Sequence, residues 1–219
     1  MNPNGAGRVD VRPPQPRDSV IYTVRLPRQV AVKFDRDRDA GHRFVVSLLP
    51  DQLGATARAQ TATLWRIGAG SESIDILTTA DLPSAQGGPV GTVDCGQSVR
   101  LKLTMEAVRA KSSPVDPEVV AALRAEGISW RDPRGRIDDG ELPAWIESQL
   151  LKHGWKAVEI RELHRRSVSR RRAQMHLVEC VVDVEVVDSA LASESLRTGI
   201  GRGRSFGAGM VTLTAPGQS

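Results

Sequence analysis

The sequence predicts an α+β fold, and three observations support this. The chain has 219 residues, which suits one large domain or two small ones of about 100 residues each. Apolar residues make up 40% of it, enough for real cores, and because aromatics are only 4% those cores rest on Val, Leu, Ile and Ala. Both halves of the chain combine alternating, strand-like segments with segments of helical spacing.

The first half reads as a strand, a helix and then further strands. The predicted strands are residues 19–27, 57–68, 71–79 and 98–108. The helix begins at Asp39, a candidate N-cap, presents apolar residues over 44–49 at helical spacing, and ends at Pro50. Between residues 79 and 98 the sequence supports a weak helix at best. This order of elements is typical of a ferredoxin-like, or RRM-like, domain: strand, helix, strand, strand, weak helix, strand.

The second half repeats this plan with additions. Helices are predicted at residues 116–127, 138–154 and 189–197, and strands at 155–163, 173–188 and 209–215. The segment 109–114 is typical of a linker, and we place the domain boundary there. We therefore expect two tandem ferredoxin-like domains, 19–108 and 115–219, behind a disordered leader at residues 1–18.

Composition and charge exclude several classes of protein. No apolar run approaches the roughly 18 residues of a membrane span, and residues 1–18 lack the apolar core of a signal peptide. We therefore expect a cytoplasmic protein that does not bind membranes. Cys95 and Cys180 are far apart, no CxxC occurs, and two cysteines alone cannot make a zinc site. We expect two buried free thiols, no metal and no cofactor.

One segment concentrates positive charge, although the net charge of +4 is only mildly basic. Residues 164–172, HRRSVSRRR, contain five arginines and no acid, and they lie between two predicted strands, at the tip of a β-hairpin. Guanidinium groups fit phosphate oxygens in pairs and stack on bases. The residues expected to bind nucleic acid are Arg165, Arg166, Arg170, Arg171 and Arg172. The alternative is a solvated charged turn, which is what most charge runs are.

A second unusual segment, GIGRGRSFGAGMVTL at 199–213, places five glycines and two arginines just before the last strand. It contains neither GxGxxG nor GxxxxGK[ST], and both nucleotide motifs need a helix after the loop, so a Rossmann site and a P-loop are excluded. Glycine lets a phosphate or ribose approach backbone N–H groups, and arginine adds charge beside them. The residues expected in this polyanion contact are Gly199, Gly201, Arg202, Gly203, Arg204, Ser205 and Gly207. The alternative is a tight helix-to-strand crossover that happens to be glycine-rich.

The same loop resembles the C-terminal glycine-rich signature of the RAMP-type CRISPR RNA endonucleases, and most of all that of the CasE family. This family is the crRNA-processing subunit of type I-E Cascade. Its pattern is matched by Gly199-Ile200-Gly201, Arg204, Phe206, Gly207 and Gly209. More loosely, the tandem ferredoxin-like plan, the strand RLKLTMEAV and the helix AWIESQLLKHGW match as well. The leader and residues 115–136 have no counterpart that we can name.

The resemblance implies a metal-independent endoribonuclease that uses no cofactor. Its substrate would be CRISPR repeat RNA with a stem-loop, cut by attack of a 2′-OH on the adjacent phosphate to leave a 2′,3′-cyclic phosphate and a 5′-OH. The enzyme would hold its product and join other Cascade subunits. The resemblance also implies that the basic hairpin binds the repeat stem, because duplex RNA is recognised by shape and phosphate.

The resemblance also points to candidate catalytic residues. The family carries its catalytic histidine in the first helix, in a His-Arg dipeptide before apolar residues, which His42-Arg43 matches, and imidazole titrates near neutrality. Arg43 and Arg204 are the candidates for stabilising the phosphate. Family members can have a tyrosine three residues before the histidine, where this chain has Asp39. That carboxylate would cap the helix or stabilise the imidazolium of His42. The sequence does not assign the second proton-transfer group.

Two other classes of function are weighed against this one. The first is a non-catalytic RNA-binding structural subunit of a CRISPR ribonucleoprotein, with the same fold and with nuclease activity lost through changes such as Asp39. The second is a small-molecule enzyme on a ferredoxin-like scaffold, which no metal cluster, nucleotide fingerprint or nucleophile motif supports. The sequence leaves open which repeat is recognised, where it is cut and which partner subunits are present.

Overall fold

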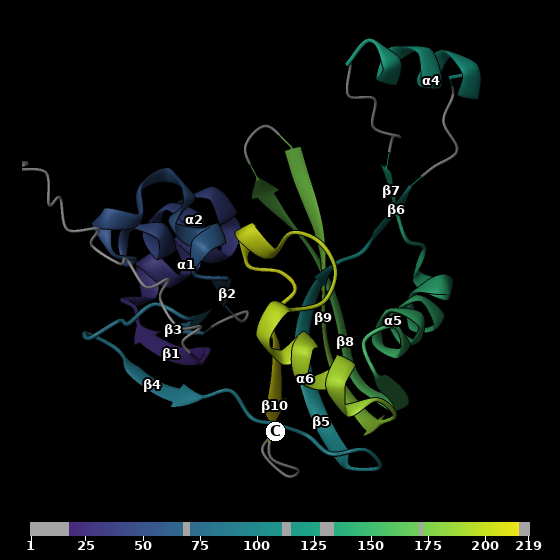
Figure 1. Ribbon diagram of the computed structural model, residues 1–219. Helices are drawn as coiled ribbons and strands as arrows, with labels where there is room; N and C mark the ends of the chain where they lie inside the picture. Colours follow the sequence, from purple (N-terminus) through teal and green to yellow (C-terminus); the bar gives the residue numbers. More distant parts are fainter. Residues whose placement is uncertain (1–17, 68–70, 111–114, 128–133, 171–172, 215–219) are drawn as a thin grey trace, which may run out of the picture.

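The computed structural model describes residues 18–67, 71–110, 115–127, 134–170 and 173–214. Residues 1–17 of the predicted leader, and Arg171 and Arg172 of the predicted RNA-binding set, lie outside these ranges. The described residues form two four-stranded antiparallel sheets, each with its own helices, and a small two-stranded sheet (Figure 1). No helix in these ranges is long and apolar enough to cross a membrane.

The first sheet has the strand order β2-β3-β1-β4. Its strands are β1 (Val20–Arg25), β2 (Leu64–Arg66), β3 (Ser73–Thr78) and β4 (Gln86–Pro89). Helices α1 (Arg28–Arg36) and α2 (Arg38–Ser47) pack on it, with Phe34 and Val45 in one buried cluster with Ile74 and Ile76. When the strands are numbered in chain order and the sheet is read from β4, the strand order is 4-1-3-2, which is the order of a ferredoxin-like domain.

The start of this half differs from the prediction at two helices. Helix α1 was not predicted, and Asp37 separates it from α2. The Asp37 carboxylate accepts hydrogen bonds from the backbone N–H groups of Asp39 and Ala40. The prediction that Asp39 caps the helix is therefore wrong, because α2 begins one residue earlier, at Arg38. The turn η1 (Asp51–Thr56) and the short helix α3 (Ala57–Gln60) follow, so the strand predicted from residue 57 begins only at β2.

The second sheet has the order β10-β5-β9-β8. Its strands are β5 (Ser98–Glu106), β8 (Trp155–Arg170), β9 (Ala173–Val186) and β10 (Val211–Thr214). Helices α5 (Leu142–Leu151) and α6 (Ser189–Thr198) share a core with it, in which Ile146 and Leu196 are buried together with Leu103 and Val182. When only the four strands of this sheet are numbered in chain order, the strand order is again 4-1-3-2. The predicted fold class, two tandem ferredoxin-like domains, is confirmed.

Strand 98–108, expected to complete the first domain, instead opens the second. It pairs with β9 from Ser98 opposite Glu185 to Glu106 opposite Leu177, and with β10 on its other side. The fourth strand of the first sheet is β4, whose sequence QGGP shows no alternation of apolar and polar residues. Alternation of apolar and polar residues predicts a strand but does not indicate which sheet the strand joins. For this reason the domain boundary was predicted after residues 98–108, whereas the second sheet already begins with them.

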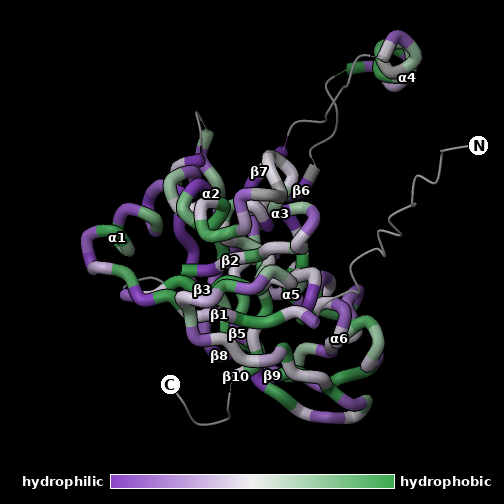
Figure 2. The backbone as a smooth tube through the Cα atoms, turned by 60° about the vertical axis from the view of Figure 1, so that its left-hand side comes forward, coloured by the Kyte–Doolittle hydropathy of each residue, from purple (hydrophilic) through white to green (hydrophobic). Residues whose placement is uncertain are grey.

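An insertion between β5 and α5 projects from the second sheet. It consists of β6 (Val108–Ala110), α4 (Pro117–Ala125), β7 (Arg134–Arg136) and the turn η2 (Asp139–Glu141). Strands β6 and β7 pair with each other, and α4 lies beyond them, away from the two sheets in both views (Figures 1 and 2). The predicted linker thus begins inside β6. Elsewhere, the apolar residues coloured green in Figure 2 concentrate on the strands and on the helix faces that meet them.

The loop between α6 and β10, residues 199–210, joins the two halves. Phe206 and Ala208 pack against the hairpin side chains Val168, Met175 and Leu177. Met210 packs against Leu64 and Leu77 of the first sheet. The loop contains the turn η3 (Arg204–Phe206) and will be called the glycine loop. Because it contacts both sheets, it holds the part of the β8–β9 hairpin near its tip next to α2.

Candidate active site

A cleft of about 740 Å³ lies where α1 and α2 meet the β8–β9 hairpin. It is lined by Arg36, Asp37, Asp39, His42, Arg43 and Ser169. Asp37 forms an isolated parallel bridge with Ser169, so the main chain at the helix junction touches that of the hairpin. The cleft therefore combines groups from both halves of the chain: two carboxylates, one imidazole, two guanidinium groups and a hydroxyl.

The structure brings His42 and Arg43 together in this cleft. Both lie in the middle of α2, His42 half-buried and Arg43 exposed. The imidazole ring of His42 contacts Phe206 of the glycine loop, with 5.3 Å between the ring centroids and an interplanar angle of 46°. The two predicted catalytic residues are thus neighbours at a junction of α2 and the glycine loop, and their catalytic roles stay predictions.

The glycine loop is exposed in its middle and buried at both ends. Residues 201–206 are exposed or half-exposed, whereas residues 199–200 and 207–210 are buried, among them Gly199 and Gly207 of the predicted polyanion contact. All five of its glycines have positive φ, between 74° and 89°, a region that favours glycine. The indole N–H of Trp65 donates to the carbonyl of Ser205 at 2.9 Å and fixes the loop to the first sheet. The loop is therefore a tight helix-to-strand crossover whose exposed part presents main chain beside His42, and the predicted polyanion contact stays a prediction.

Arg204 is exposed, but its guanidinium group binds the glycine loop itself. Its Nε donates to the carbonyl of Gly201 and its Nη1 to the carbonyl of Thr198, both at 3.0 Å. The second bond satisfies the carbonyl of the last residue of α6, which has no partner inside the helix, and the first closes the loop that follows. Arg202 is exposed on the same loop. The catalytic role predicted for Arg204 stays a prediction, and its observed contacts close the loop.

Two of the predicted RNA-binding arginines are engaged with carboxylates. Arg165 pairs with Asp139 of η2 at 2.5 Å. Arg166 pairs with Asp35 of α1 and with Glu179 of β9, and thereby links the two halves. Each of the two arginine side chains is 18% exposed. Their described contacts are therefore structural, and RNA binding by them stays a prediction.

Arg170 lies closer to the hairpin tip and to the cleft. Its guanidinium carbon is 5.2 Å from the ring centroid of Phe206, whose ring also contacts His42. Its Nη1 is 3.8 Å from Glu106, and its side chain is 31% exposed. Of the three described arginines of the predicted RNA-binding set in this hairpin, Arg170 is the most exposed, and its contact with Phe206 connects it to His42.

Two buried side chains that the sequence analysis missed hold α2 against the glycine loop. Trp65 is fully buried, and a Cβ atom added to Gly41 of α2 would come within 2.5 Å of its ring. Arg38 is also fully buried, with its guanidinium carbon 5.4 Å from the centroid of the Trp65 ring. Burial, and after it the charge of Arg166, lowers the pKa of Arg38 to about 10, against the effect of two nearby carboxylates. An arginine in a charged segment and an isolated tryptophan give no sequence signal for such a role.

The comparison with protein families decides what kind of protein this is. A family model described as CRISPR associated protein matches residues 21–215. The chain belongs to this family. No curated protein matches the chain in sequence.

Solved structures of CRISPR-associated proteins share its fold. The CRISPR endoribonuclease Cse3 bound to 19 nt RNA superposes with a TM-score of 0.67 at 20% identity, covering 91% of this chain and 100% of the other. Thermus thermophilus Cse3 bound to an RNA representing a pre-cleavage complex gives 0.64 at 19%, covering 90% and 100%. A chain of a CRISPR RNA-guided surveillance complex, pre-nicking, gives 0.56 at 17%, covering 90% and 99%. At sequence identities of 20% and below, the structural similarity establishes that the fold is shared.

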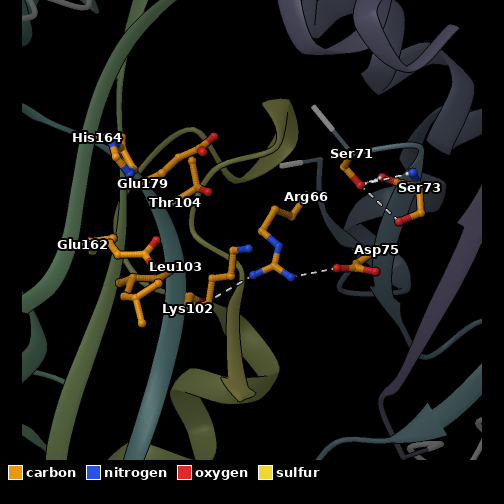
Figure 3. Close-up of a pocket in the computed structure, with 12 residues that line it drawn as sticks. Arg66, Ser71, Ser73, Asp75, Lys102, Leu103, Thr104, Glu162, His164 and Glu179 are labelled. Atoms are coloured by element: carbon orange, nitrogen blue, oxygen red, sulfur yellow. Dashed lines mark hydrogen bonds and ion pairs between the residues drawn. The ribbon is translucent and has the colours of Figure 1, made fainter. Parts of the chain in front are cut away.

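This CRISPR-associated protein has a second cavity, of about 410 Å³, between its two sheets (Figure 3). Arg66 of β2 reaches into it and donates to Asp75 of β3 and to Thr212 of β10, both at 2.7 Å. Among the lining residues of the second sheet are Lys102, Glu162, His164 and Glu179. Acidic side chains outnumber basic ones here, so the first cleft suits a polyanion better. Within the described ranges, no group of three or more His, Cys, Asp or Glu is arranged to hold a metal ion.

Proposed function

We propose that this chain is an endoribonuclease that cleaves CRISPR precursor RNA at repeat stem-loops. The 2′-OH of one nucleotide attacks the adjacent phosphate, which leaves a 2′,3′-cyclic phosphate on one product and a 5′-OH on the other. The reaction needs no metal ion. The observation that carries the proposal is His42, which sits in a charged cleft where α2, the glycine loop and the β8–β9 hairpin meet.

In the proposed reaction, His42 transfers a proton and Arg43 stabilises charge on the phosphate. Imidazole exchanges protons near neutral pH, and a positioned acid or base contributes about 10²–10⁴-fold to the rate. Arg43 is exposed in the same cleft, where it can bind a non-bridging oxygen. Arg204 adds positive charge at the rim of the glycine loop. The residues proposed to contact the sugar-phosphate chain are the exposed or half-exposed Gly201, Arg202, Gly203 and Ser205.

The hairpin is proposed to bind the repeat stem through phosphates. Arg170 borders the cleft through Phe206, and Arg171 and Arg172 follow it in sequence. An A-form duplex presents its phosphates as a regular surface, which a row of guanidinium groups can follow without reading bases. Arg165 and Arg166 also belong to the proposed contact set, in addition to their ion pairs.

We further propose that the protein keeps its product within a Cascade-type complex with other subunits. A chain of similar fold occurs in a CRISPR RNA-guided surveillance complex, which supports this. Size-exclusion chromatography of the protein after cleavage should show the stem-bearing product eluting with the protein. Elution of the product as free RNA would contradict product retention.

Cleavage of a repeat hairpin RNA in EDTA tests the reaction directly. We expect the wild-type protein to cut the RNA in EDTA, and a 2′-deoxy substitution at the scissile nucleotide to block the cut. His42→Ala should lower the single-turnover rate at least about 100-fold with little change in RNA affinity. His153→Ala, at the end of α5, is the matched control and should cleave normally.

Two results of this experiment would contradict the proposal. RNA that is bound but not cut would identify the non-catalytic RNA-binding subunit, which the presence of Asp39 in place of a tyrosine favours. Unchanged single-turnover cleavage by His42→Ala would remove His42 from the mechanism.

The salt dependence of RNA binding tests the hairpin. Arg170→Ala should weaken binding and reduce the slope of log K against log salt by about one unit, because one phosphate contact is lost. Arg161→Ala is the control, since Arg161 lies on the same strand and pairs with Asp183 and Glu159. Equal slopes for Arg170→Ala and the wild-type protein would contradict the role of the hairpin tip.

A further inference from the structure

The two carboxylates of the cleft beside α2 differ in what they do for the fold. Oδ1 of Asp37 accepts hydrogen bonds from the backbone N–H groups of Asp39 and Ala40, at 3.0 and 3.1 Å, and thereby caps the helix. Asp39 is the second residue of α2 and lies inside its first turn. The capping role that would explain a carboxylate at position 39 is thus already filled by Asp37.

Asp39 and His42 lie on the same side of α2. They are three residues apart, a spacing that brings Cβ atoms on a helix to about 5–6 Å from each other. Both side chains are half-buried and both line the cleft, together with Arg43. A phosphodiester bound by Arg43 would therefore lie within reach of a carboxylate and an imidazole at the same time.

We propose that Asp39 accepts the proton of the attacking 2′-OH and that His42 donates a proton to the leaving oxygen. This assignment rests on the proposed endoribonuclease function. The proton of the 2′-OH moves to the Asp39 carboxylate while the 2′-oxygen forms a bond to phosphorus. The bond from phosphorus to the 5′-oxygen breaks, and that oxygen takes the proton of the His42 imidazolium. Atoms and charges balance with no further reactant, and the products are a 2′,3′-cyclic phosphate and a 5′-OH.

Charged groups from three elements face this pair. Arg36 of α1 and Asp37 at the helix junction line the cleft, as does Arg43 of α2. Arg170 of β8 lies on Phe206, whose ring contacts His42. Ser169 of β8 adds a hydroxyl, which stays neutral. Two guanidinium groups in the cleft, with that of Arg170 beside it on Phe206, supply positive charge for one phosphodiester.

Asp39→Asn is tested in a single-turnover cleavage assay with Asp51→Asn as the control. Asp51 is exposed at the start of η1, outside the residues that line the cleft. Each variant removes one negative charge at nearly constant shape. Asp39→Asn should lower the cleavage rate about 10²–10⁴-fold, because an amide cannot accept the proton. Asp51→Asn should retain the rate within about fivefold, and both variants should bind the repeat hairpin within about threefold of the wild-type affinity.

Two further readouts separate proton transfer from a structural effect. The rate of the wild-type protein should rise and then fall with pH, and Asp39→Asn should lose the rising, acidic limb that ionisation of the carboxyl causes. Added acetate or formate should restore cleavage by Asp39→Ala in a saturable way, and should not restore cleavage by His42→Ala.

The outcomes distinguish this inference from the proposed function. A wild-type protein that does not cut the hairpin in EDTA would overturn both. A wild-type protein that cuts, together with Asp39→Asn that cuts at a similar rate, would overturn only the role of Asp39. Equal losses in Asp39→Asn and Asp51→Asn would also overturn it, because the rate would then respond to net charge and not to a specific proton acceptor.

Discussion

Gly207 occupies a position that only glycine fits, for two separate reasons. Its φ is +76°, and an added Cβ would lie 2.8 Å from the Trp65 ring and 2.9 Å from Nη1 of Arg38. Gly207→Ala should therefore lower the free energy of unfolding by about 2–4 kcal/mol, from strain and overpacking together. Gly201→Ala is the control, because φ is +79° there but nothing lies within 4 Å of the added Cβ, and about 1–2 kcal/mol is expected. Urea denaturation of both variants tests this, and equal losses would contradict the packing argument.

The two thiols should differ in reactivity. Cys180 is buried, and burial, with a smaller effect of Glu179, raises its pKa to about 12. Because the thiolate is the reactive form, iodoacetamide at pH 8 should label only the exposed Cys95 in the native protein and both cysteines in denaturant. Mass spectrometry of the labelled protein measures this. Native labelling of Cys180 at the rate of Cys95 would contradict the burial of Cys180.

At the residue scale, the sequence predicted residues that belong to short motifs and missed residues whose roles depend on packing between segments far apart in the chain. The His42-Arg43 dipeptide and the glycine loop were recognised, and the structure brings them together. Arg38 and Trp65 were missed because their roles depend on contacts between α2, β2 and the glycine loop, which are far apart in sequence. Cys95 was expected to be buried and is exposed, so that prediction is wrong. Its neighbours, DCGQ, are turn formers, whereas Cys180 lies in an alternating strand.

At the element scale, Asp183 of β9 ties together three strands of the second sheet. Its carboxylate accepts hydrogen bonds from Arg100 of β5 at 2.6 Å and from Arg161 of β8 at 2.8 Å. These bonds, that of Arg100 first, lower the pKa of Asp183 to about 2. A carboxyl whose folded pKa is depressed stabilises the protein above its unfolded value near 4, and this contribution is lost as the pH falls through about 2.

Asp183→Asn should therefore destabilise the protein in a pH-dependent way. At pH 7 the free energy of unfolding should fall by less than about 1 kcal/mol, because the group is partly exposed and screened by solvent. The difference from the wild-type protein should shrink steadily between pH 4 and pH 2. Urea denaturation at several pH values measures it, with Glu185→Gln as a control for an exposed ion pair. A difference that is constant over this range would show that the ion pairs of Asp183 are not its cause.

The elements with a strong periodic pattern were the ones predicted correctly. Strand β9 and the helices α5 and α6 alternate or repeat clearly, and each was found close to its observed range. Strand β8 was predicted to end at residue 163 but continues to Arg170, so most of the arginine segment predicted at the hairpin tip lies within the strand. Strand β4 is four polar or small residues at the edge of a sheet, so it has no apolar pattern to detect. Helix α1 is short, lies between Pro27 and Asp37, and contains VAVKF, which is as compatible with a strand as with a helix.

At the scale of the whole molecule, the two halves are held together by a charged cluster as well as by the glycine loop. Arg166 of the hairpin pairs with Asp35 of α1 and Glu179 of β9, and donates to the carbonyl of Ile67 at 3.4 Å. Arg38 lies 3.4 Å from the same Asp35. All four charged side chains are buried or mostly buried, and the cluster is balanced between two guanidinium groups and two carboxylates.

Removing Arg166 should destabilise the contact between the two halves by more than the loss of one positive charge would. Arg166→Met leaves Glu179 and part of Asp35 without a partner in a poorly solvated place, so we expect a loss of about 2–4 kcal/mol in the free energy of unfolding. Adding Glu179→Met to this variant should recover much of the loss, because a buried pair replaced by apolar groups costs little. Arg161→Met, on the same strand but with its own side chain 48% exposed, should cost less than about 1 kcal/mol. Urea denaturation of the four proteins measures the coupling, and an unchanged stability of Arg166→Met would mean that apolar contacts alone hold the halves together.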